Sequence, residues 1–312
     1  MRRWVGYRRK SKCACARGVR GTDYPWWVTD FLREGPRVAV ITDSTASLPD
    51  SLRVAAGLRV VNLHVLTQTQ SFEENADITP DRCAHLLTQH QTLTTSQPTR
   101  EDFEKVLTRV WAEGYESAVM VLISSGLSGT VDTARLVAEN SSRPVEVVDS
   151  LTAGMALGLA ALAAARAADE GRPAKEVALV ASRVAATSGA FFMVDSLDYL
   201  RRGGRLGAAA AAVGTVLGLK PILTIDDSGQ IVVAAKVRTR TAALAYLRER
   251  ALDGVREGAG AIALHYFGDA ERAHTLADEL RAEVTVPVHV SSASAVLGSH
   301  VGPGLVAVTF AN

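Results

Sequence analysis

The pattern that most constrains this chain is an alternation of short, β-branched apolar runs with helical segments, which begins after Arg37. Residues 38–41 form one such run, which leads to the polar side chain of Asp43. Residues 145–148 repeat the arrangement and end at Asp149. Because strands that alternate with helices pair side by side through crossover connections, this pattern predicts βαβ units and a parallel sheet.

Local capping signals place several of the helices. Thr79 and Pro80 suit the N-cap and the first position of a helix. Thr99 and Asp102 resemble a capping box at the start of a helix that runs to residue 113. Two more strands of this half are expected at residues 58–65 and 118–123.

The second half of the chain is expected to fold differently. The turn residues 226–229, Asp-Asp-Ser-Gly, lie between apolar runs at 222–225 and 231–237, which predicts an antiparallel hairpin. Further strands are expected at 191–194, 261–266, 287–290 and 305–310, with helices at 239–253 and 270–283. The predicted fold class is therefore α/β, with an N-terminal domain built on a parallel sheet and a C-terminal α+β domain built on a mixed sheet.

The length of the chain, 312 residues, is too great for one ordinary core and suits two domains. We place the boundary between Ser150 and Gly189, which gives an N-terminal α/β domain over residues 37–165 and a C-terminal domain over 166–312. The apolar stretch 152–168 is shorter than the roughly 20 residues that span a membrane, so we expect a buried helix. A net charge of +1 and 5% aromatic residues argue against a nucleic-acid partner.

Residues 1–36 are rich in arginine and lysine and contain no acid before Asp23. They lack the apolar core of a secretory signal, so we interpret them as a disordered basic tail and expect a cytoplasmic protein. The three cysteines, Cys13, Cys15 and Cys83, have neither a redox nor a zinc spacing. We therefore expect thiols without a role, and neither a disulfide nor a metal site.

Small hydroxyl residues gather at the expected carboxyl ends of the N-terminal strands, where ligands bind in open α/β sheets. The stretch 124–130, Ser-Ser-Gly-Leu-Ser-Gly-Thr, leads into a helix and contains the candidates Ser124, Ser125 and Gly126. Its glycines allow close backbone approach, and the free N–H groups of the helix would favour a carboxylate or phosphate. The alternative is a helix start without a ligand. The loop 94–98 adds the candidates Thr94, Thr95 and Ser96.

Two further segments are candidates in the second half. His300 precedes a Gly-Pro-Gly turn at 302–304, and an imidazole held there can donate a hydrogen bond to an oxyanion. Arg201, Arg202 and Arg205 surround two glycines and can form a phosphate clamp. The alternatives are a structural histidine and a solvated basic turn, and we interpret the other six histidines as structural.

Seven segments, taken in order, resemble the DegV family, and the resemblance runs from Arg37 to Phe310. The segments are residues 40–46, 94–98, 123–130, 194–205, 219–223, 236–239 and 300–304. The resemblance implies two α/β domains with a long-chain fatty acid bound between them. Similar proteins are the binding subunits of a bacterial fatty acid kinase: they hold the fatty acid while a separate ATP-dependent kinase subunit phosphorylates its carboxylate. The acyl-phosphate then feeds phospholipid synthesis.

The resemblance also implies roles for individual residues. Thr95, Ser125 and His300 match the positions that hold the carboxylate, and we infer that the three arginines of the basic segment contact the kinase. No cofactor is implied besides the bound fatty acid, and transient contact with a membrane surface is left open. The sequence departs from the family at Asn75, where members often show Asp-Gly, and at His64. Both departures leave acyl selectivity open.

Three other interpretations remain. The first is a serine hydrolase acting on an acyl ester, with Ser125 as nucleophile, His300 as base and Asp149 as the orienting acid, although the Gly-x-Ser-x-Gly motif is absent. The second is a self-sufficient kinase, which lacks support because the Walker A and protein-kinase motifs are missing. The third is a structural or signalling module that keeps the acyl chain as part of its fold.

Overall fold

The computed structural model of the protein describes residues 35–207 and 219–312. The expected basic tail, apart from its last two residues, lies outside the described residues. The described residues form three sheets, one with four strands, one with six and one with three.

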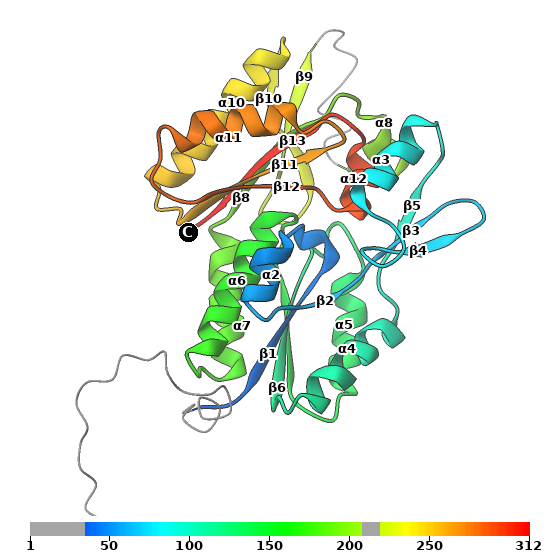
Figure 1. The fold of residues 1–312 in the computed structure, drawn as a ribbon, viewed down its shortest axis with the longest axis vertical. Helices are drawn as coiled ribbons and strands as arrows, with labels where there is room; N and C mark the ends of the chain where they lie inside the picture. Colours follow the sequence, from blue (N-terminus) through cyan, green and yellow to red (C-terminus); the bar gives the residue numbers. More distant parts are fainter. Residues whose placement is uncertain (1–34, 208–218) are drawn as a thin grey trace, which may run out of the picture. The chain divides into compact units, whose positions relative to one another are not determined.

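The N-terminal half forms the four-stranded sheet, in the order β2-β1-β6-β7. Its strands, each parallel to its neighbours, are β1 (Val38–Asp43), β2 (Arg59–Val61), β6 (Ser117–Leu122) and β7 (Val145–Asp149). One face is covered by α4 (Arg100–Ala112) and α5 (Thr130–Glu139), and the other by α6 (Met155–Asp169) and α7 (Ala174–Ala186) (Figure 1). The short helix α2 (Asp50–Ala55) links β1 to β2. The predicted parallel sheet is confirmed.

Two helices of this half begin where the sequence predicts, because local caps hold their first turns. The Thr99 hydroxyl accepts a hydrogen bond from the Asp102 N–H, and the Asp102 carboxylate accepts one from the Thr99 N–H, which completes the capping box of α4. Thr79 caps α3 (Pro80–Thr88) by accepting from the Arg82 N–H.

The C-terminal half forms a mixed six-stranded sheet in the order β10-β9-β8-β13-β11-β12. The strands are β8 (Gly189–Met193), β9 (Lys220–Ile225), β10 (Ile231–Val237), β11 (Ala261–Phe267), β12 (Val288–Ser292) and β13 (Leu305–Ala311). β11 and β12 are parallel and the other pairs are antiparallel, including the predicted hairpin β9-β10. The helices α10 (Arg240–Arg256) and α11 (Glu271–Arg281) pack against this sheet.

The alanine-rich helix α6 lies between the two larger sheets. It contacts β1 and β6 of the parallel sheet and β11 and β13 of the mixed sheet. Its small side chains allow both sheets to approach it closely, and most of them are buried, as the sequence predicts. None of the helices in residues 35–207 and 219–312 is both long enough and apolar enough to cross a membrane.

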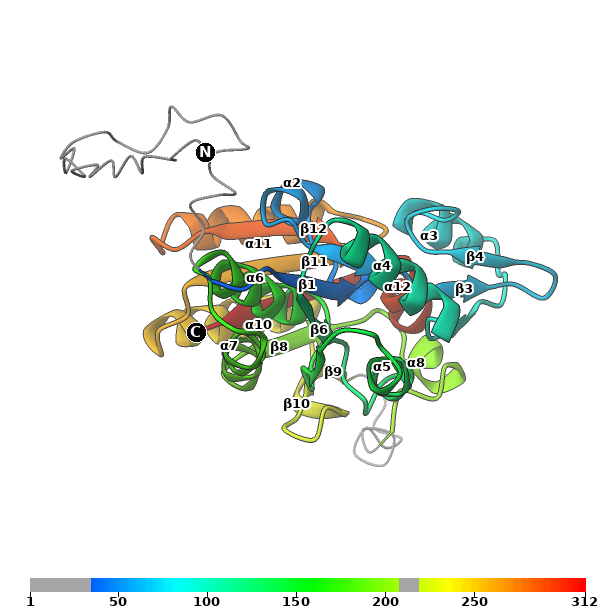
Figure 2. The same cartoon turned by 90° about the horizontal axis from the view of Figure 1, so that it is seen from below.

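A small antiparallel sheet in the order β4-β3-β5 lies at one side of the molecule. It consists of β3 (His64–Leu66), β4 (Ser71–Glu73) and β5 (Thr94–Ser96). Figures 1 and 2 both show β3 and β4 on the same side as α3, α8 (Asp198–Arg202) and α12 (Ala295–Val301). A buried apolar cluster joins these elements to the mixed sheet. We call it the lateral core, and it includes Leu63, Val65, Phe72, Ile78, Leu87, Phe192, Leu200, Phe267 and Val296.

The predicted single strand over residues 58–65 is wrong. The structure divides it into β2 and β3, which belong to different sheets. The break falls at Leu63, whose N–H donates to the Ser44 hydroxyl at 3.0 Å and whose carbonyl accepts from the Glu74 N–H at 2.9 Å. Because both backbone groups of Leu63 are bound outside the parallel ladder, the chain leaves the first sheet here.

The predicted division of the chain after residue 165 stays a prediction. Helix α7, which follows that position, packs against β6 and β7 of the parallel sheet.

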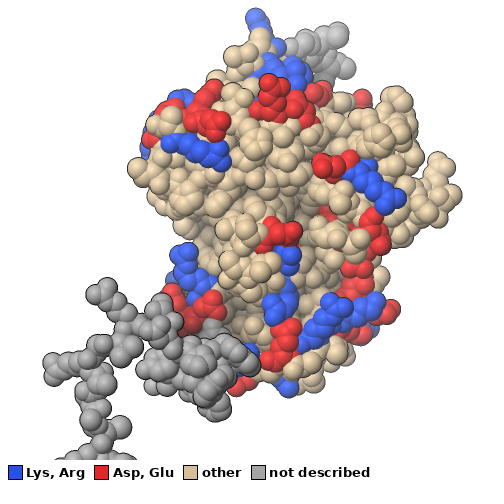
Figure 3. Space-filling view, viewed as in Figure 1, with Lys and Arg blue, Asp and Glu red and all other residues tan. Residues whose placement is uncertain are grey.

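Charged side chains on the face in Figure 3 form small acidic and basic groups side by side, without one continuous basic field. On this face the charge pattern agrees with the near-neutral net charge of the sequence.

Candidate ligand-binding site

The loop after β6 lies where the strand order of the parallel sheet reverses. From β1 the chain continues to β2 on one side, whereas β6 continues to β7 on the other. The Asp43 carboxylate joins the two central strand ends, because it accepts from the Ile123 N–H at 2.7 Å and from the Thr45 N–H at 2.9 Å. Burial raises the pKa of Asp43 to about 6. Open α/β sheets bind ligands at such a reversal, so the loop is well placed for recognition.

His300 lies in the last turn of α12, a helix that the sequence analysis did not predict. The Ser294 hydroxyl caps the helix by accepting from the Leu297 N–H, and Gly302 ends it with a φ of 74°. The expected turn over 302–304 therefore follows a helix, and that helix fixes the imidazole.

Thr95 and His300 meet in the structure although they are 205 residues apart in the sequence. The Thr95 hydroxyl and His300 Nε2 are 2.7 Å apart, while His300 Nδ1 has no hydrogen-bond partner among the described residues. Burial, and then the charge of Arg205, lowers the pKa of His300 to about 4. The imidazole is therefore neutral near pH 7, and its Nδ1 is enclosed beside Gly203.

A cavity of about 280 Å³ lies beside this pair. Its polar lining is Thr95, Ser96, Gln97, Ser128, Arg205 and His300, and its apolar lining is Leu63, Ile123, Leu127, Leu200, Ile231, Val296, Leu297 and Val301. Leu63, Leu200 and Val296 also belong to the lateral core. The cavity thus has a polar wall next to aliphatic side chains of the lateral core.

Arg205 lies at the polar wall and is held there by backbone groups. Its Nε donates to the Leu127 carbonyl at 3.1 Å and its Nη1 donates to the Gly203 carbonyl at 2.6 Å. The other two arginines of the basic segment do not line the cavity. Arg201 forms an ion pair with Asp198 at 2.7 Å, and Arg202 lies over the Tyr199 ring. The structure therefore brings Arg205 to the cavity and leaves Arg201 and Arg202 exposed on α8.

The remaining candidates of the sequence analysis lie around the cavity rather than in its wall. Ser124 is buried: its hydroxyl donates to the Gly229 carbonyl at 2.8 Å and accepts from the Gly126 N–H at 3.0 Å, which binds the loop to the hairpin β9-β10. Ser125 and Gly126 are exposed, and a Cβ at Gly126 would lie 2.7 Å from the Gly229 carbonyl oxygen. Thr94 is also exposed. Thr95, Ser96 and His300 are thus the predicted hydroxyl and imidazole groups that share the cavity.

The arrangement does not form a hydrolase triad. In the described part of the chain, no hydrogen bond joins His300 to Ser125 or Asp149. The Asp149 carboxylate instead accepts from the backbone N–H groups of Ser125 and Leu151, each at 3.1 Å. A general base must reach the nucleophile directly or through one water, and here the His300 Nε2 is bonded to Thr95.

Sequence reasoning missed the role of Gly203. A Cβ at this position would lie 2.2 Å from His300 Nδ1, so only glycine lets the imidazole take its observed place. Ser128 and Gln97, which line the cavity, also received no role. All three belong to segments used for the family resemblance, so position within a motif was their only signal.

Among the described residues, no group of three His, Cys, Asp or Glu side chains is arranged to hold a metal ion.

The parallel and mixed sheets, with helices packed against them, define an α/β protein with a polar-walled cavity beside the lateral core. The family model described as "Uncharacterised protein, DegV family COG1307" matches residues 37–312. A DegV domain-containing protein of Streptomyces coelicolor is 41% identical over 273 residues, which cover 87% of this chain and 97% of the relative. This chain therefore belongs to the DegV family.

Two solved structures extend the likeness to ligand binding in relatives. A fatty-acid-binding DegV family protein from Thermus thermophilus superposes with a TM-score of 0.78 at 33% identity, over 88% of this chain and 100% of that one. DegV from Bacillus subtilis, a fatty acid binding protein, superposes with a TM-score of 0.81 at 29% identity, over 89% of this chain and 99% of that one. Structural neighbours of this chain are thus fatty-acid-binding proteins.

Proposed function

We propose that this protein binds a long-chain fatty acid, with the carboxylate at Thr95 and His300 and the acyl chain in the lateral core. The observation that carries the proposal is the 2.7 Å contact between Thr95 and His300 at the polar wall of a largely apolar cavity. A buried carboxylate must be paired and hydrogen-bonded. With the proton of the neutral imidazole on Nε2, His300 donates to the Thr95 hydroxyl, which is then free to donate to the carboxylate. Arg205 supplies the opposite charge.

The apolar part of the ligand would provide most of the binding energy. About 15 methylenes at about 0.8 kcal/mol each give roughly 12 kcal/mol of gross transfer free energy. Immobilising the ligand and opening the site reduce this gain. The cavity of about 280 Å³ would receive the carboxyl end, and side chains of the lateral core would move aside for the rest of the chain.

We infer further that the protein presents the carboxylate to a separate ATP-dependent kinase subunit, which forms the acyl-phosphate. Two residues that line the cavity, Ile123 and Leu127, precede and follow the exposed Ser125 in the same loop. Arg201 and Arg202 are exposed on α8, which packs against α12. A partner that meets this surface would reach the carboxylate and would find unburied guanidinium groups for its phosphates.

The cellular location of the proposed activity follows from its chemistry. An ATP-dependent partner and a product destined for phospholipid synthesis imply work in the cytoplasm, with transient contact at the membrane surface. In this proposal the chain is a carrier and the kinase is the enzyme, so the bound fatty acid is its ligand and no other cofactor takes part.

Native mass spectrometry of the purified chain, followed by lipid extraction, tests the binding step. We expect one added mass that matches a C14–C18 fatty acid. His300→Ala and Thr95→Val should lose most of this occupancy, while His274→Ala, at an exposed position on α11, should keep it. A chain that stays empty after incubation with oleate or palmitate contradicts the proposal.

Reconstitution with a purified bacterial fatty acid kinase subunit and ATP tests the transfer step. Trapping with hydroxylamine should detect acyl-phosphate only when both proteins are present. Acyl-phosphate from this chain and ATP alone would show instead that it is a self-sufficient kinase.

A further inference from the structure

Glu74 is a buried acid that does not line the proposed binding site. It follows β4 directly and is 0% exposed. Its Oε1 accepts from the Val296 N–H, in the first turn of α12, at 3.0 Å. Its own N–H donates to the Leu63 carbonyl at 2.9 Å. A buried carboxyl group costs free energy unless its hydrogen bonds repay the loss of water, so these bonds indicate what Glu74 does.

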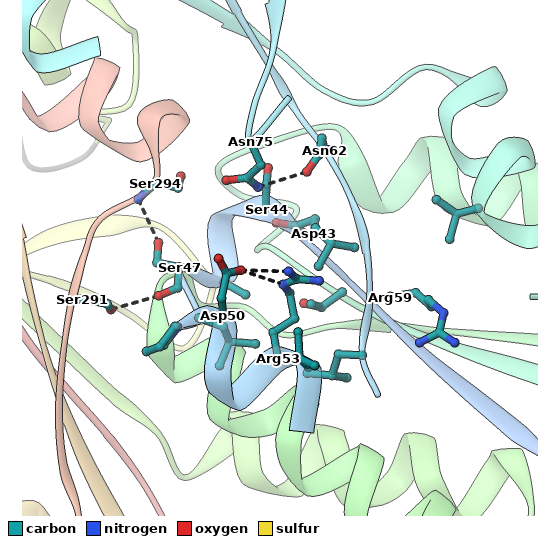
Figure 4. Close-up of a pocket in the computed structure, with 18 of the residues that line it drawn as sticks. Asp43, Ser44, Ser47, Asp50, Arg53, Arg59, Asn62, Asn75, Ser291 and Ser294 are labelled. Atoms are coloured by element: carbon teal, nitrogen blue, oxygen red, sulfur yellow. Dashed lines mark hydrogen bonds and ion pairs between the residues drawn. The ribbon is translucent and has the colours of Figure 1, made fainter. Parts of the chain in front are cut away.

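On one side, Glu74 is bonded to the sheet that holds Thr95. Leu63, its backbone partner, directly precedes β3, and β3 pairs with β5, the strand that contains Thr95. The next residue, Asn75, fixes the same segment, because its amide donates to the Asn62 side-chain carbonyl at 3.1 Å in the wall of a second cavity (Figure 4). The position of Glu74 relative to Thr95 is therefore set by hydrogen bonds.

On the other side, Glu74 is bonded to the helix that holds His300. Val296 and His300 are four residues apart in α12, about one helical turn, and both line the cavity of the proposed site. The helix has only seven residues, so contacts from outside must fix its place. Two side chains accept from its start: Ser47 from the Ser294 N–H at 3.0 Å (Figure 4), and Glu74 from the Val296 N–H.

We propose that Glu74 is the positioning residue that sets the separation between Thr95 and His300. The inference rests on the proposed function, in which this pair binds the carboxylate. Glu74 is bonded both to the helix of His300 and to the residue before the strand that pairs with the strand of Thr95. The 2.7 Å contact between the two side chains tolerates little displacement, because hydrogen bonds weaken steeply with poor geometry. What Val296 needs from Glu74 is an oxygen acceptor, which glutamine also supplies.

The Nε2 proton of His300 tests this position in the protein without ligand. It is observed by NMR after labelling with 15N-histidine, and its signal is assigned by its loss in His300→Gln. The hydrogen bond to Thr95 should slow exchange of this proton with water. Glu74→Ala should speed the exchange by about tenfold or more, whereas Glu74→Gln, which keeps the acceptor, should stay within about threefold of the wild type.

Cys83→Ala is the matched control, because Cys83 is also 0% exposed and contacts the same helix. Its Sγ lies 3.4 Å from the Ala295 carbonyl oxygen and 3.3 Å from the Ser299 hydroxyl, and neither residue lines the cavity. The substitution should lower the melting temperature and leave the exchange rate within about threefold. Glu74→Asp serves where Glu74→Ala does not fold: it keeps the charge, but its shorter side chain should not reach the Val296 N–H.

Affinity for a fluorescent fatty acid analogue should follow the same order. We expect a loss of about tenfold in Glu74→Ala or Glu74→Asp, and little change in Glu74→Gln and Cys83→Ala. An exchange rate that stays at the wild-type value in Glu74→Ala and Glu74→Asp, or that rises equally in Glu74→Gln or Cys83→Ala, overturns the proposal. Because exchange is measured without ligand, it separates a failure of this proposal from a failure of the wild type to bind fatty acid.

Discussion

Two regions of the molecule each hold a histidine whose pKa is lowered by burial, and the two differ in how many ring nitrogens have a hydrogen-bond partner. Burial lowers the pKa of both His265 and His300 to about 4. His265 lies on β11, and its Nε2 accepts from the Met155 N–H at 2.8 Å. Its Nδ1 is 3.1 Å from the Ser291 hydroxyl. Both ring nitrogens of His265 are thus satisfied, whereas His300 has a partner on one nitrogen only.

The comparison shows that burial and a shifted pKa do not identify a functional histidine. His265 joins the start of α6 to the mixed sheet, and Gly154 allows this contact, because a Cβ there would lie 3.0 Å from His265 Nε2. Since Nε2 must accept from a backbone N–H, the proton of the neutral ring lies on Nδ1. His300 lies instead in a cavity wall with Nδ1 unpartnered among the described residues.

The largest expected effect is on stability, from His265→Ala. The substitution leaves the buried Met155 N–H without an acceptor and creates a cavity between α6 and the mixed sheet. We expect the free energy of unfolding to fall by about 3 kcal/mol, measured by denaturant titration near pH 7.5. His274→Ala, at an exposed histidine, should change it by less than about 0.5 kcal/mol. A loss below about 1 kcal/mol for His265→Ala would contradict the structural role.

Acid should destabilise the protein through both histidines. Their folded-state pKa values of about 4 lie below the ordinary value of 6.5, so the unfolded chain binds more protons between these pH values. Stability contributed by each neutral ring is therefore complete above pH 6.5 and is lost as the pH falls toward 4. The shift of His265, which is 3% exposed, corresponds to at most about 3 kcal/mol.

Asp43 acts in the opposite direction, because burial raises its pKa to about 6 and the folded protein binds its proton more tightly. The decisive measurement is therefore a difference between variants. Denaturant titrations at several pH values between 7.5 and 4 should show a smaller loss for His300→Gln than for the wild type. Identical profiles would mean that the His300 ring titrates as it does in the unfolded chain.

Elements defined by neighbouring residues could be predicted from the sequence. The capping box at Thr99 and Asp102 and the hairpin over residues 226–229 depend on groups a few positions apart, and both are confirmed. The predicted single strand over 58–65 is wrong, because the groups that divide it at Leu63 belong to Ser44 and Glu74, which are distant from it in sequence. Short elements such as β5 and α12 are stabilised by tertiary packing rather than by propensity.

The candidate site was predictable only in part for the same reason. The family resemblance selected Thr95 and His300, but no periodicity or spacing relates residues that are 205 positions apart. The approach of Gly203 to the imidazole is likewise a tertiary contact. The hydroxyl-rich loop is recognisable in the sequence, because small residues directly before a helix are typical of an anion-binding helix start. The direction of each hydroxyl cannot be predicted in this way: that of Ser124 points to the hairpin β9-β10, where it donates to the Gly229 carbonyl.

Gly203→Ala should disturb the His300 region without disturbing the His265 region. The backbone at Gly203 has a φ of −75°, which alanine adopts freely, so the expected effect comes from the 2.2 Å approach of the new Cβ to His300 Nδ1. We expect fatty acid affinity to fall about tenfold, which is about 1.4 kcal/mol. Gly260→Ala is the control, because nothing lies within 4 Å of its added Cβ.

A fluorescent fatty acid analogue, titrated into both variants at constant pH, measures this effect. The pH dependence of unfolding assigned to His265 should be the same in both. Unchanged affinity in Gly203→Ala would mean that the imidazole can move without loss, and His300 would then be a structural histidine like His265.

The smallest expected effect on stability comes from Ser125→Ala. Ser125 is exposed, and the contact it makes with Asp149 uses its backbone N–H, which alanine keeps. We therefore expect the free energy of unfolding to stay within about 0.5 kcal/mol of the wild type. The resemblance to the DegV family implies that Ser125 also meets the carboxylate. On that interpretation the rate of acyl-phosphate formation with the kinase subunit and ATP should fall, as it should in His300→Ala. Full phosphate transfer by Ser125→Ala would remove this serine from the site and leave the carboxylate to Thr95, His300 and Arg205.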